Sequence, residues 1–232
     1  MYFLHGEQVS PAPRTVTAPA TAADAVRALL AGPGRYERAH GRTTAIPSGT
    51  ALRSVVIRDR VATVDLSGRY DDGGGGSLSL RARLAQVVFT VTRFPGVRKV
   101  RFALDGTPVR HFGGEGVVLN GPVGRADFED LAPAVLMESP MTGDSVGSPL
   151  RVRGSADTFE AVFRLRVTDT TGRTAADVMV RATSGTGTRG TFDVTFPCKA
   201  VRTGPGLLKA YFLSPADGRP VTVDTVPLTV RR

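Results

Sequence analysis

The chain has a single cysteine, no tryptophan, three histidines and no run of 18 apolar residues. One cysteine excludes an internal disulfide and a cysteine-rich metal site, and we expect Cys198 to be a small buried side chain. The lack of a long apolar run argues against a membrane-spanning helix. His5, His40 and His111 have no second histidine or carboxylate at ligand spacing, so the sequence predicts no metal site.

Lysine is also scarce, since only three of the 30 basic residues are lysines. The net charge of +9 is spread along the chain: residues 1–132 carry 17 basic and 12 acidic residues, and residues 133–232 carry 13 and 9. Nucleic-acid binding needs basic residues gathered on one surface, so dispersed charge predicts no nucleic-acid partner. The bias toward arginine is typical of a high-GC genome and indicates an actinobacterial source.

Hydrophobic residues make up 41% of the chain, which is enough for real cores, and 27 glycines and 16 prolines indicate many turns. The pattern changes between Phe128 and Gly154: helical and strand periodicities alternate before this passage, whereas every periodic segment after it has the spacing of a strand. The sequence therefore predicts two domains, residues 1–132 and residues 133–232.

For the first domain the sequence predicts an α+β fold, a small sheet covered by two helices. Thr21 and Asp24 have the spacing of a reciprocal cap for a helix that ends at Gly32-Pro33, and a polar loop is expected over Arg35 to Arg42. A hairpin is expected over 52–66. A longer helix should begin near Ser77, with Leu80, Leu84 and Val88 on its buried face and Arg81 and Gln86 elsewhere.

For the second domain the sequence predicts an all-β immunoglobulin-like sandwich of six or seven strands. Phe163, Leu165 and Val167 alternate with polar residues, and Phe192, Val194 and Phe196 do the same further on. The first strand is expected at 150–153. No cysteine pair or tryptophan of the antibody type is present, so apolar contacts alone should hold the sandwich together.

Several motifs of the two domains resemble those of known families. The first domain resembles a GerMN domain, named for sporulation and germination proteins, and the second resembles the immunoglobulin-like domain associated with bacterial spore germination. The GerMN-like motifs are YFL, DAVRALLAGP (24–33), TTAIPSGT (43–50), VATVDLSG (61–68), RLAQVVFTVTRFPGVRKVRFALDG (83–106) and GGEGV (113–117). The motifs of the second domain are ESP (138–140), GD (143–144), SPLRVRG (148–154), FEAVF (159–163) and ATSGTGTRGTFDVTFP (182–197).

The resemblance implies an extracytoplasmic protein of the cell envelope, typically a lipoprotein of Gram-positive bacteria, with no enzymatic activity known for either module. Because GerMN domains are similar to ring-building motifs, it implies an envelope protein partner or self-association. The lipid-bearing cysteine of such lipoproteins is absent from this sequence, since Cys198 lies deep in the chain. Contact with a membrane is therefore expected only through an N-terminal lipid anchor of a full-length protein.

The residues predict no catalytic site and no cofactor. Asp127, Glu129 and Asp130 are close enough to raise the possibility of a hydrolase, but a role at the start of a helix accounts for them. Glu115, between two glycines, and a loop over 184–189 are the candidates for partner binding. Thr186, Thr188 and Arg189 carry this loop's polar groups, and the alternative is that the loop is purely structural.

The leading hypothesis is a non-catalytic envelope protein that acts as a protein-interaction or scaffolding module. The alternative is a peptidoglycan-binding or cell-wall-binding module, because exposed arginine and threonine side chains bind carboxylates and sugars. The low aromatic content of 6% argues against stacking on sugar rings.

Overall fold

The structure is a computed structural model that describes residues 1–15, 18–72, 74–114, 116–214 and 216–232. Its contacts divide the chain into two compact units, Met1–Leu131 and Ala132–Arg232. The division falls one residue from the expected boundary at 132/133. Among the described residues, no helix is long and apolar enough to cross a membrane. The two units are taken one at a time below.

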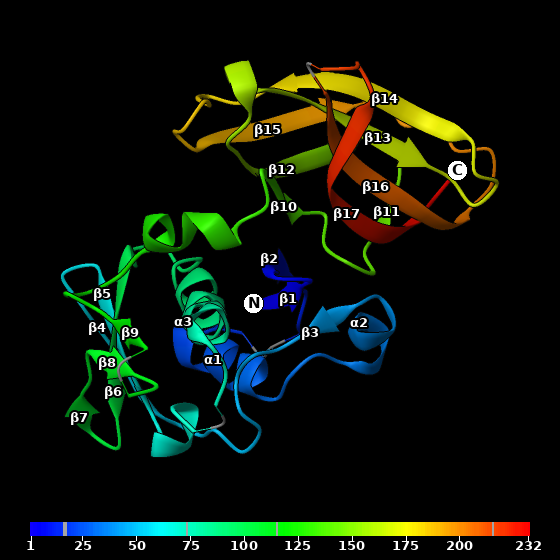
Figure 1. The fold of residues 1–232 in the computed structure, drawn as a ribbon. Coiled ribbons are helices and arrows are strands. Elements are labelled where there is room, and N and C mark those ends of the chain that lie inside the picture. Colours follow the sequence, from blue (N-terminus) through cyan, green and yellow to red (C-terminus); the bar gives the residue numbers. More distant parts are fainter. Residues whose placement is uncertain (16–17, 73, 115, 215) are drawn as a thin grey trace. The chain divides into compact units, whose positions relative to one another are not determined.

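The described residues of the first unit form two sheets of three and four strands, a two-stranded pair and three helices, which Figure 1 labels. One sheet has the order β2-β1-β3, and the other has the order β4-β5-β6-β7 with β5 and β6 parallel. The strands are β1 (Tyr2–His5), β2 (Gln8–Pro11), β3 (Arg42–Thr43), β4 (Leu52–Arg58), β5 (Val61–Leu66), β6 (Lys99–Leu104) and β7 (Thr107–Pro108), with a separate pair of β8 (His111–Phe112) and β9 (Val117–Val118). The helices are α1 (Ala22–Leu30), α2 (Arg35–Ala39) and α3 (Ser77–Val91), with 3-10 turns η1 (Gly68–Tyr70) and η2 (Arg125–Leu131).

Helix α1 begins where the sequence predicts. The backbone N–H of Asp24 donates to Thr21 Oγ1 at 3.2 Å, and the Asp24 carboxylate accepts from the Thr21 backbone N–H at 3.1 Å. This reciprocal pair satisfies two N–H groups that a helix start leaves without intrahelical partners. Val26 and Leu29 lie on its buried face.

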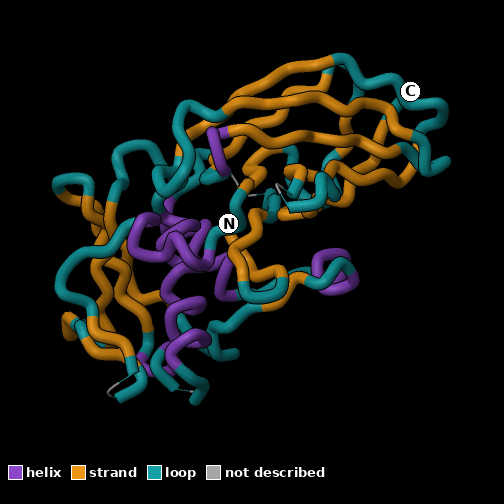
Figure 2. The backbone as a smooth tube through the Cα atoms, turned by 45° about the horizontal axis from the view of Figure 1, so that its top comes forward, coloured by secondary structure: helices purple, strands orange, loops and turns teal. Residues whose placement is uncertain are grey.

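Helix α3 contacts both sheets of the first unit rather than covering only one (Figure 2). The expectation that Gln86 lies away from the core is therefore wrong, because Gln86 is completely buried. Its side-chain carbonyl accepts from the backbone N–H of Ala45 at 2.9 Å, and its amide donates to the backbone carbonyl of Tyr2 at 3.3 Å. A buried amide of this kind keeps its polar groups satisfied and joins α3 to the segments on either side.

The expected polar loop over 35–42 is instead the short helix α2 followed by β3. Glu37 is buried in α2 and accepts hydrogen bonds from Arg14 and from the backbone N–H of Gly34. Burial alone would raise the pKa of Glu37, but the hydrogen bonds from Arg14 and Gly34 lower it below its usual value. The long-range partner Arg14 makes the helix possible, and local sequence patterns do not reveal it.

The second unit is a two-sheet sandwich. One sheet has the order β10-β12-β15 and the other the order β11-β17-β16-β13-β14. The strands are β10 (Val135–Ser139), β11 (Ser145–Val146), β12 (Leu150–Ala156), β13 (Val162–Thr168), β14 (Thr174–Arg181), β15 (Gly190–Phe196), β16 (Gly204–Leu213) and β17 (Pro220–Val230), with a 3-10 turn η3 (Phe159–Ala161). The first strand is β10, which lies in the segment that the sequence assigns to the junction, because Val135 and Met137 pair with β12 and enter the core.

The core of the sandwich is apolar. Phe163 and Phe192 meet edge to face with centroids 4.9 Å apart, and Leu165, Val152 and Leu208 are fully buried around them. Cys198 is buried in the same core and burial raises the pKa of its thiol, which confirms its expected role as a small apolar side chain.

Candidate functional site: an apolar pocket in the immunoglobulin-like unit

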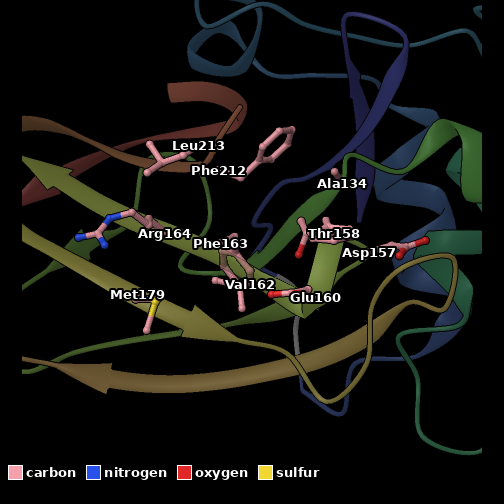
Figure 3. A pocket seen from close by; sticks show the side chains of 11 residues that line it. Ala134, Asp157, Thr158, Glu160, Val162, Phe163, Arg164, Met179, Phe212 and Leu213 are labelled. Carbon is pink, nitrogen blue, oxygen red and sulfur yellow. The ribbon is translucent and has the colours of Figure 1, made fainter. Parts of the chain in front are cut away.

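The second unit contains an open pocket of about 590 Å³, shown in Figure 3. Its wall comes from three strands of the larger sheet and from the segment that joins β12 to β13. The residues that line it are Ala134, Asp157, Thr158, Phe159, Glu160, Val162, Phe163, Arg164, Met179, Phe212 and Leu213. All of them belong to the second unit.

The pocket owes its shape to the crossover at 157–161, where the chain passes from one sheet to the other. Glu160 and Ala161 have φ angles of 53° and 60°, the left-handed region that side chains with a Cβ rarely adopt. Such positions cost about 1 kcal/mol or more each and persist only where the surroundings hold them in place. Backbone strain of this kind is common at binding sites.

The loop between β14 and β15 holds the crossover in this conformation. The backbone N–H of Thr186 donates to the carbonyl of Thr158 at 3.0 Å, and Thr186 Oγ1 accepts from the backbone N–H of Glu160 at 3.1 Å. The backbone N–H of Gly187 donates to the Asp157 carboxylate at 2.8 Å. A Cβ on Gly185 would lie 2.4 Å from the Thr158 carbonyl oxygen and 2.6 Å from the Ala161 nitrogen, so this position requires glycine.

Three large apolar side chains around the pocket are left in solvent. Phe159 is 76% exposed, Met179 is 71% exposed and Leu213 is 55% exposed. Single exposed apolar residues are ordinary, but three around one concave surface form a contiguous apolar patch.

One buried polar group in the pocket wall has no partner. Thr158 is only 6% exposed, and its Oγ1 has no hydrogen-bond partner in the described part of the chain. A buried hydroxyl without a hydrogen bond costs about 1–3 kcal/mol. The hydroxyl itself is buried, so this cost falls on the stability of the unit and gives the pocket no polar contact.

A charged network borders the pocket on the outer face of the larger sheet. The carboxylate of Asp177 accepts from Arg164 at 3.0 Å, from Arg166 at 2.8 Å and from the Tyr211 hydroxyl at 2.9 Å. Partial burial alone would raise the pKa of Asp177, but hydrogen bonds from Arg166, Tyr211 and Arg164 lower it below its usual value. Arg164 is thereby fixed, so the rim of the pocket is rigid on this side.

The predicted partner-binding residues have different places in the structure. Thr186 supports the crossover behind the pocket, as described above, and Thr188 is exposed in the same loop. Arg189 donates to the backbone carbonyls of Pro133 at 2.8 Å and Ser155 at 3.3 Å, so its guanidinium holds the start of the unit against β12. Glu115 lies outside the described residues. Whether these residues bind a partner stays a prediction.

Sequence reasoning missed the pocket, although it named the loop that supports it. The signal for Met179 is in the alternation of β14, because burying Val178 and Val180 turns Met179 toward the opposite face. Phe159 carries no such signal. It precedes the alternating strand, and only the left-handed turn at 160–161 explains its exposure.

The acids singled out in the first unit have structural roles. The Asp127 carboxylate accepts from the backbone N–H of Gly124 at 2.7 Å, and Asp130 forms an ion pair with Arg81 at 2.5 Å. Among the described residues there is no group of His, Cys, Asp or Glu side chains that fits a metal ion. What the pocket offers chemically is a largely apolar surface, which is suited to binding.

The chain thus joins a mixed α/β unit to an immunoglobulin-like sandwich that carries an apolar pocket. A family model described as "Sporulation and spore germination" (Germane) matches residues 1–110, and one described as "Immunoglobulin-like domain of bacterial spore germination" (Gmad2) matches residues 134–219. The chain therefore carries a Germane domain followed by a Gmad2 domain.

Solved structures give weaker likenesses. The first GerMN domain of the sporulation protein GerM from Bacillus subtilis is 19% identical, with 54% of this chain and 96% of that chain covered and a TM-score of 0.42. The tandem GerMN domains of the same protein are 14% identical, covering 85% and 59%, with a TM-score of 0.42. A Clostridium perfringens structure titled as a candidate lipoprotein is 25% identical, covering 47% and 69%, with a TM-score of 0.40. No curated protein matches. All three TM-scores are below 0.5, so the assignment depends on the family matches.

Proposed function

We propose that this chain is a non-catalytic extracytoplasmic protein of the cell envelope that binds a protein partner through the pocket of its immunoglobulin-like domain. The partner inserts an apolar side chain between Phe159 and Met179. The full-length protein is held at the membrane as a lipoprotein. Membership of the sporulation and germination families supports the location, and the pocket supports the mode of binding.

The observation that carries the proposal is the exposed apolar wall formed by Phe159, Met179 and Leu213. Protein interfaces bury aromatic residues and methionine at their centre, and a strand-rich partner presents both side chains and backbone groups at such a site. Sugar polymers need stacked aromatic planes or many converging polar groups. Arg189 already donates hydrogen bonds to the backbone carbonyls of Pro133 and Ser155. The loop therefore offers peptidoglycan carboxylates fewer hydrogen-bond donors than the sequence implies.

In-cell photo-crosslinking tests the proposal. A photoreactive amino acid at Met179 is compared with the same amino acid at Thr174, an exposed position on the same strand that does not line the pocket. We expect a defined protein adduct at Met179 that weakens with the additional change Phe159→Ser. Equal adducts at both positions, or no effect of Phe159→Ser, would contradict the proposal.

Two measurements on the purified chain separate the other possibilities. Sedimentation velocity over a concentration series tests self-association, and a strictly monomeric result removes a second copy as the partner. Co-sedimentation with protein-free sacculi tests the cell-wall alternative against an unrelated protein of similar charge. Salt-resistant pelleting beyond that control would favour peptidoglycan over a protein partner.

A further inference from the structure

The sheet of the Germane unit brings together basic residues that the sequence keeps apart. Because β5 and β6 are parallel neighbours, Val61 lies beside Lys99 and Thr63 lies beside Arg101. The backbone N–H groups of Arg98 and Lys99 both donate to the carbonyl of Arg60, at 2.8 and 3.2 Å. The turn after β4 and the start of β6 thus form one corner of the sheet (Figure 1). We call the exposed residues Arg58, Arg60, Arg98, Lys99 and Arg101 the basic corner.

The pleat of the sheet turns part of the basic corner toward one face. Arg58 pairs with Val61, which pairs with Lys99, so these three residues form one row across the sheet. Val56, Thr63 and Arg101 form the next row on the same side. The alternate residues, including Val64 and Phe102, are buried on the opposite side. The outer face therefore presents three cations from two strands, with Arg60 and Arg98 at its margin.

The positive charge of this corner is not neutralised within the unit. In the described part of the chain, none of its five basic side chains forms an ion pair. The carboxylates of Asp65, on β5, and Asp105, in the turn after β6, both form ion pairs with Arg53, at 3.6 and 3.3 Å. Asp59, in the turn itself, is the acid that remains among these cations. Dispersed charge in the sequence is thus concentrated by the topology.

An exposed apolar side chain lies directly beside these cations. Val56, on the same face as Arg58 and Arg101, is 46% exposed. Ile57 pairs with the buried Ala62 and so belongs to the opposite face. Soluble polyanions gain nothing from an exposed valine. A bilayer surface takes both, since its phosphates attract arginine and lysine while apolar side chains enter the boundary below the headgroups.

We propose that the basic corner, with Val56, binds the surface of a bilayer that contains anionic phospholipids. This contact is separate from a lipid anchor and from the pocket of the immunoglobulin-like unit. It holds the Germane unit against the membrane by charge attraction and shallow apolar insertion.

Vesicle co-sedimentation of the purified chain tests this proposal. Vesicles of phosphatidylglycerol mixed with phosphatidylcholine are compared with pure phosphatidylcholine, at low and high salt. We expect binding to the anionic vesicles only, weakening as salt rises. Each basic residue near an anionic surface strengthens binding roughly fivefold. The variant Arg58→Gln/Arg101→Gln, which removes two, should therefore bind the anionic vesicles about 25-fold more weakly. The control Arg173→Gln/Arg202→Gln removes the same charge from exposed positions of the other unit and should bind like the parent.

Two further experiments test whether the bound phosphate belongs to a bilayer or to a soluble polymer, and whether the exposed apolar side chain contributes to binding. The variant Val56→Ser should reduce vesicle binding without changing binding to a soluble poly(glycerol phosphate). Circular dichroism checks that each variant is folded. The proposal would be overturned by equal losses in the basic-corner variant and its control, or by binding to neutral vesicles. It would also be overturned if a soluble polyanion competed fully while Val56→Ser had no effect.

Discussion

Gly185 gives the sharpest test of how the pocket is held in shape. A Cβ at this position would lie 2.4 Å from the Thr158 carbonyl oxygen, 2.6 Å from the Ala161 nitrogen and 2.7 Å from its Cα. All three are backbone atoms, so no side chain can swing away to make room. Relieving the contact requires the loop and the crossover to move apart, which lengthens the hydrogen bond from Thr186 to Thr158.

The expected cost of Gly185→Ala follows from these contacts. Overpacking a tight site costs typically 1–3 kcal/mol, and three backbone contacts place this change at the upper end, about 3 kcal/mol. For a domain of this size, each kcal/mol lowers the melting temperature by roughly 4–8 °C. The transition of the immunoglobulin-like unit should therefore fall by about 12–24 °C.

Differential scanning calorimetry of the whole chain measures this shift, with Gly147→Ala as the control. Gly147 lies in the same unit, and a Cβ there would meet only Arg231 Cβ at 4.0 Å. The reasoning is refuted if the two variants melt within a few degrees of each other. Gly185→Ala should also change the shape of the pocket. We therefore expect this variant to give less photo-crosslinked adduct from Met179, even at temperatures at which it is folded.

Three other predictions concern buried polar groups. Thr158→Val removes a hydroxyl that has no partner while keeping the shape, so stability to urea should stay equal or rise by about 1 kcal/mol; a clear loss would mean that the hydroxyl is bonded. Gln86→Ala leaves the Ala45 N–H and the Tyr2 carbonyl without their partner and should destabilise the Germane unit by about 2–4 kcal/mol in urea, whereas an unchanged midpoint would refute the bridging role. The pKa of Asp177 is lower in the folded state than in the unfolded state, so its contribution is present above the unfolded pKa and is lost as the pH falls through the folded pKa. Asp177→Asn should therefore flatten the acid side of the stability curve below about pH 4, and an unchanged acid side would contradict this.

Local patterns in the sequence predicted the regular elements well, because those patterns are themselves local. The cap at Thr21, the hairpin over 52–66 and the start of α3 depend on residues within a few positions of one another. The buried Gln86 and the helix at 35–39 depend on partners more than 20 residues away, Tyr2 for one and Arg14 for the other. Periodicity carries no information about such partners, and each error in the first unit arose there.

The candidate sites also depend on contacts between residues that are far apart in the sequence. The loop over 184–189 was recognised from its glycines and threonines, but its contribution is to position Thr158 and Phe159, and no local pattern connects these residues with the loop. Likewise, counting charges along the chain found no basic surface, because Arg60 and Lys99 become neighbours only through the parallel pairing of β5 and β6. In both cases the proposed surface is produced by contacts between segments far apart in the sequence, which a single sequence does not state.

The two proposed contacts differ in their physical basis, and salt separates them. Binding through the pocket is apolar and depends on Phe159 and Met179, so raising the ionic strength should leave it unchanged or strengthen it slightly. Binding through the basic corner depends on Arg58 and Arg101, so it should weaken steeply over the same range. We therefore expect crosslinking at Met179 to persist in salt that releases the chain from anionic vesicles. Loss of both at the same salt concentration would mean that one electrostatic surface serves both partners, and the pocket would then have no separate role.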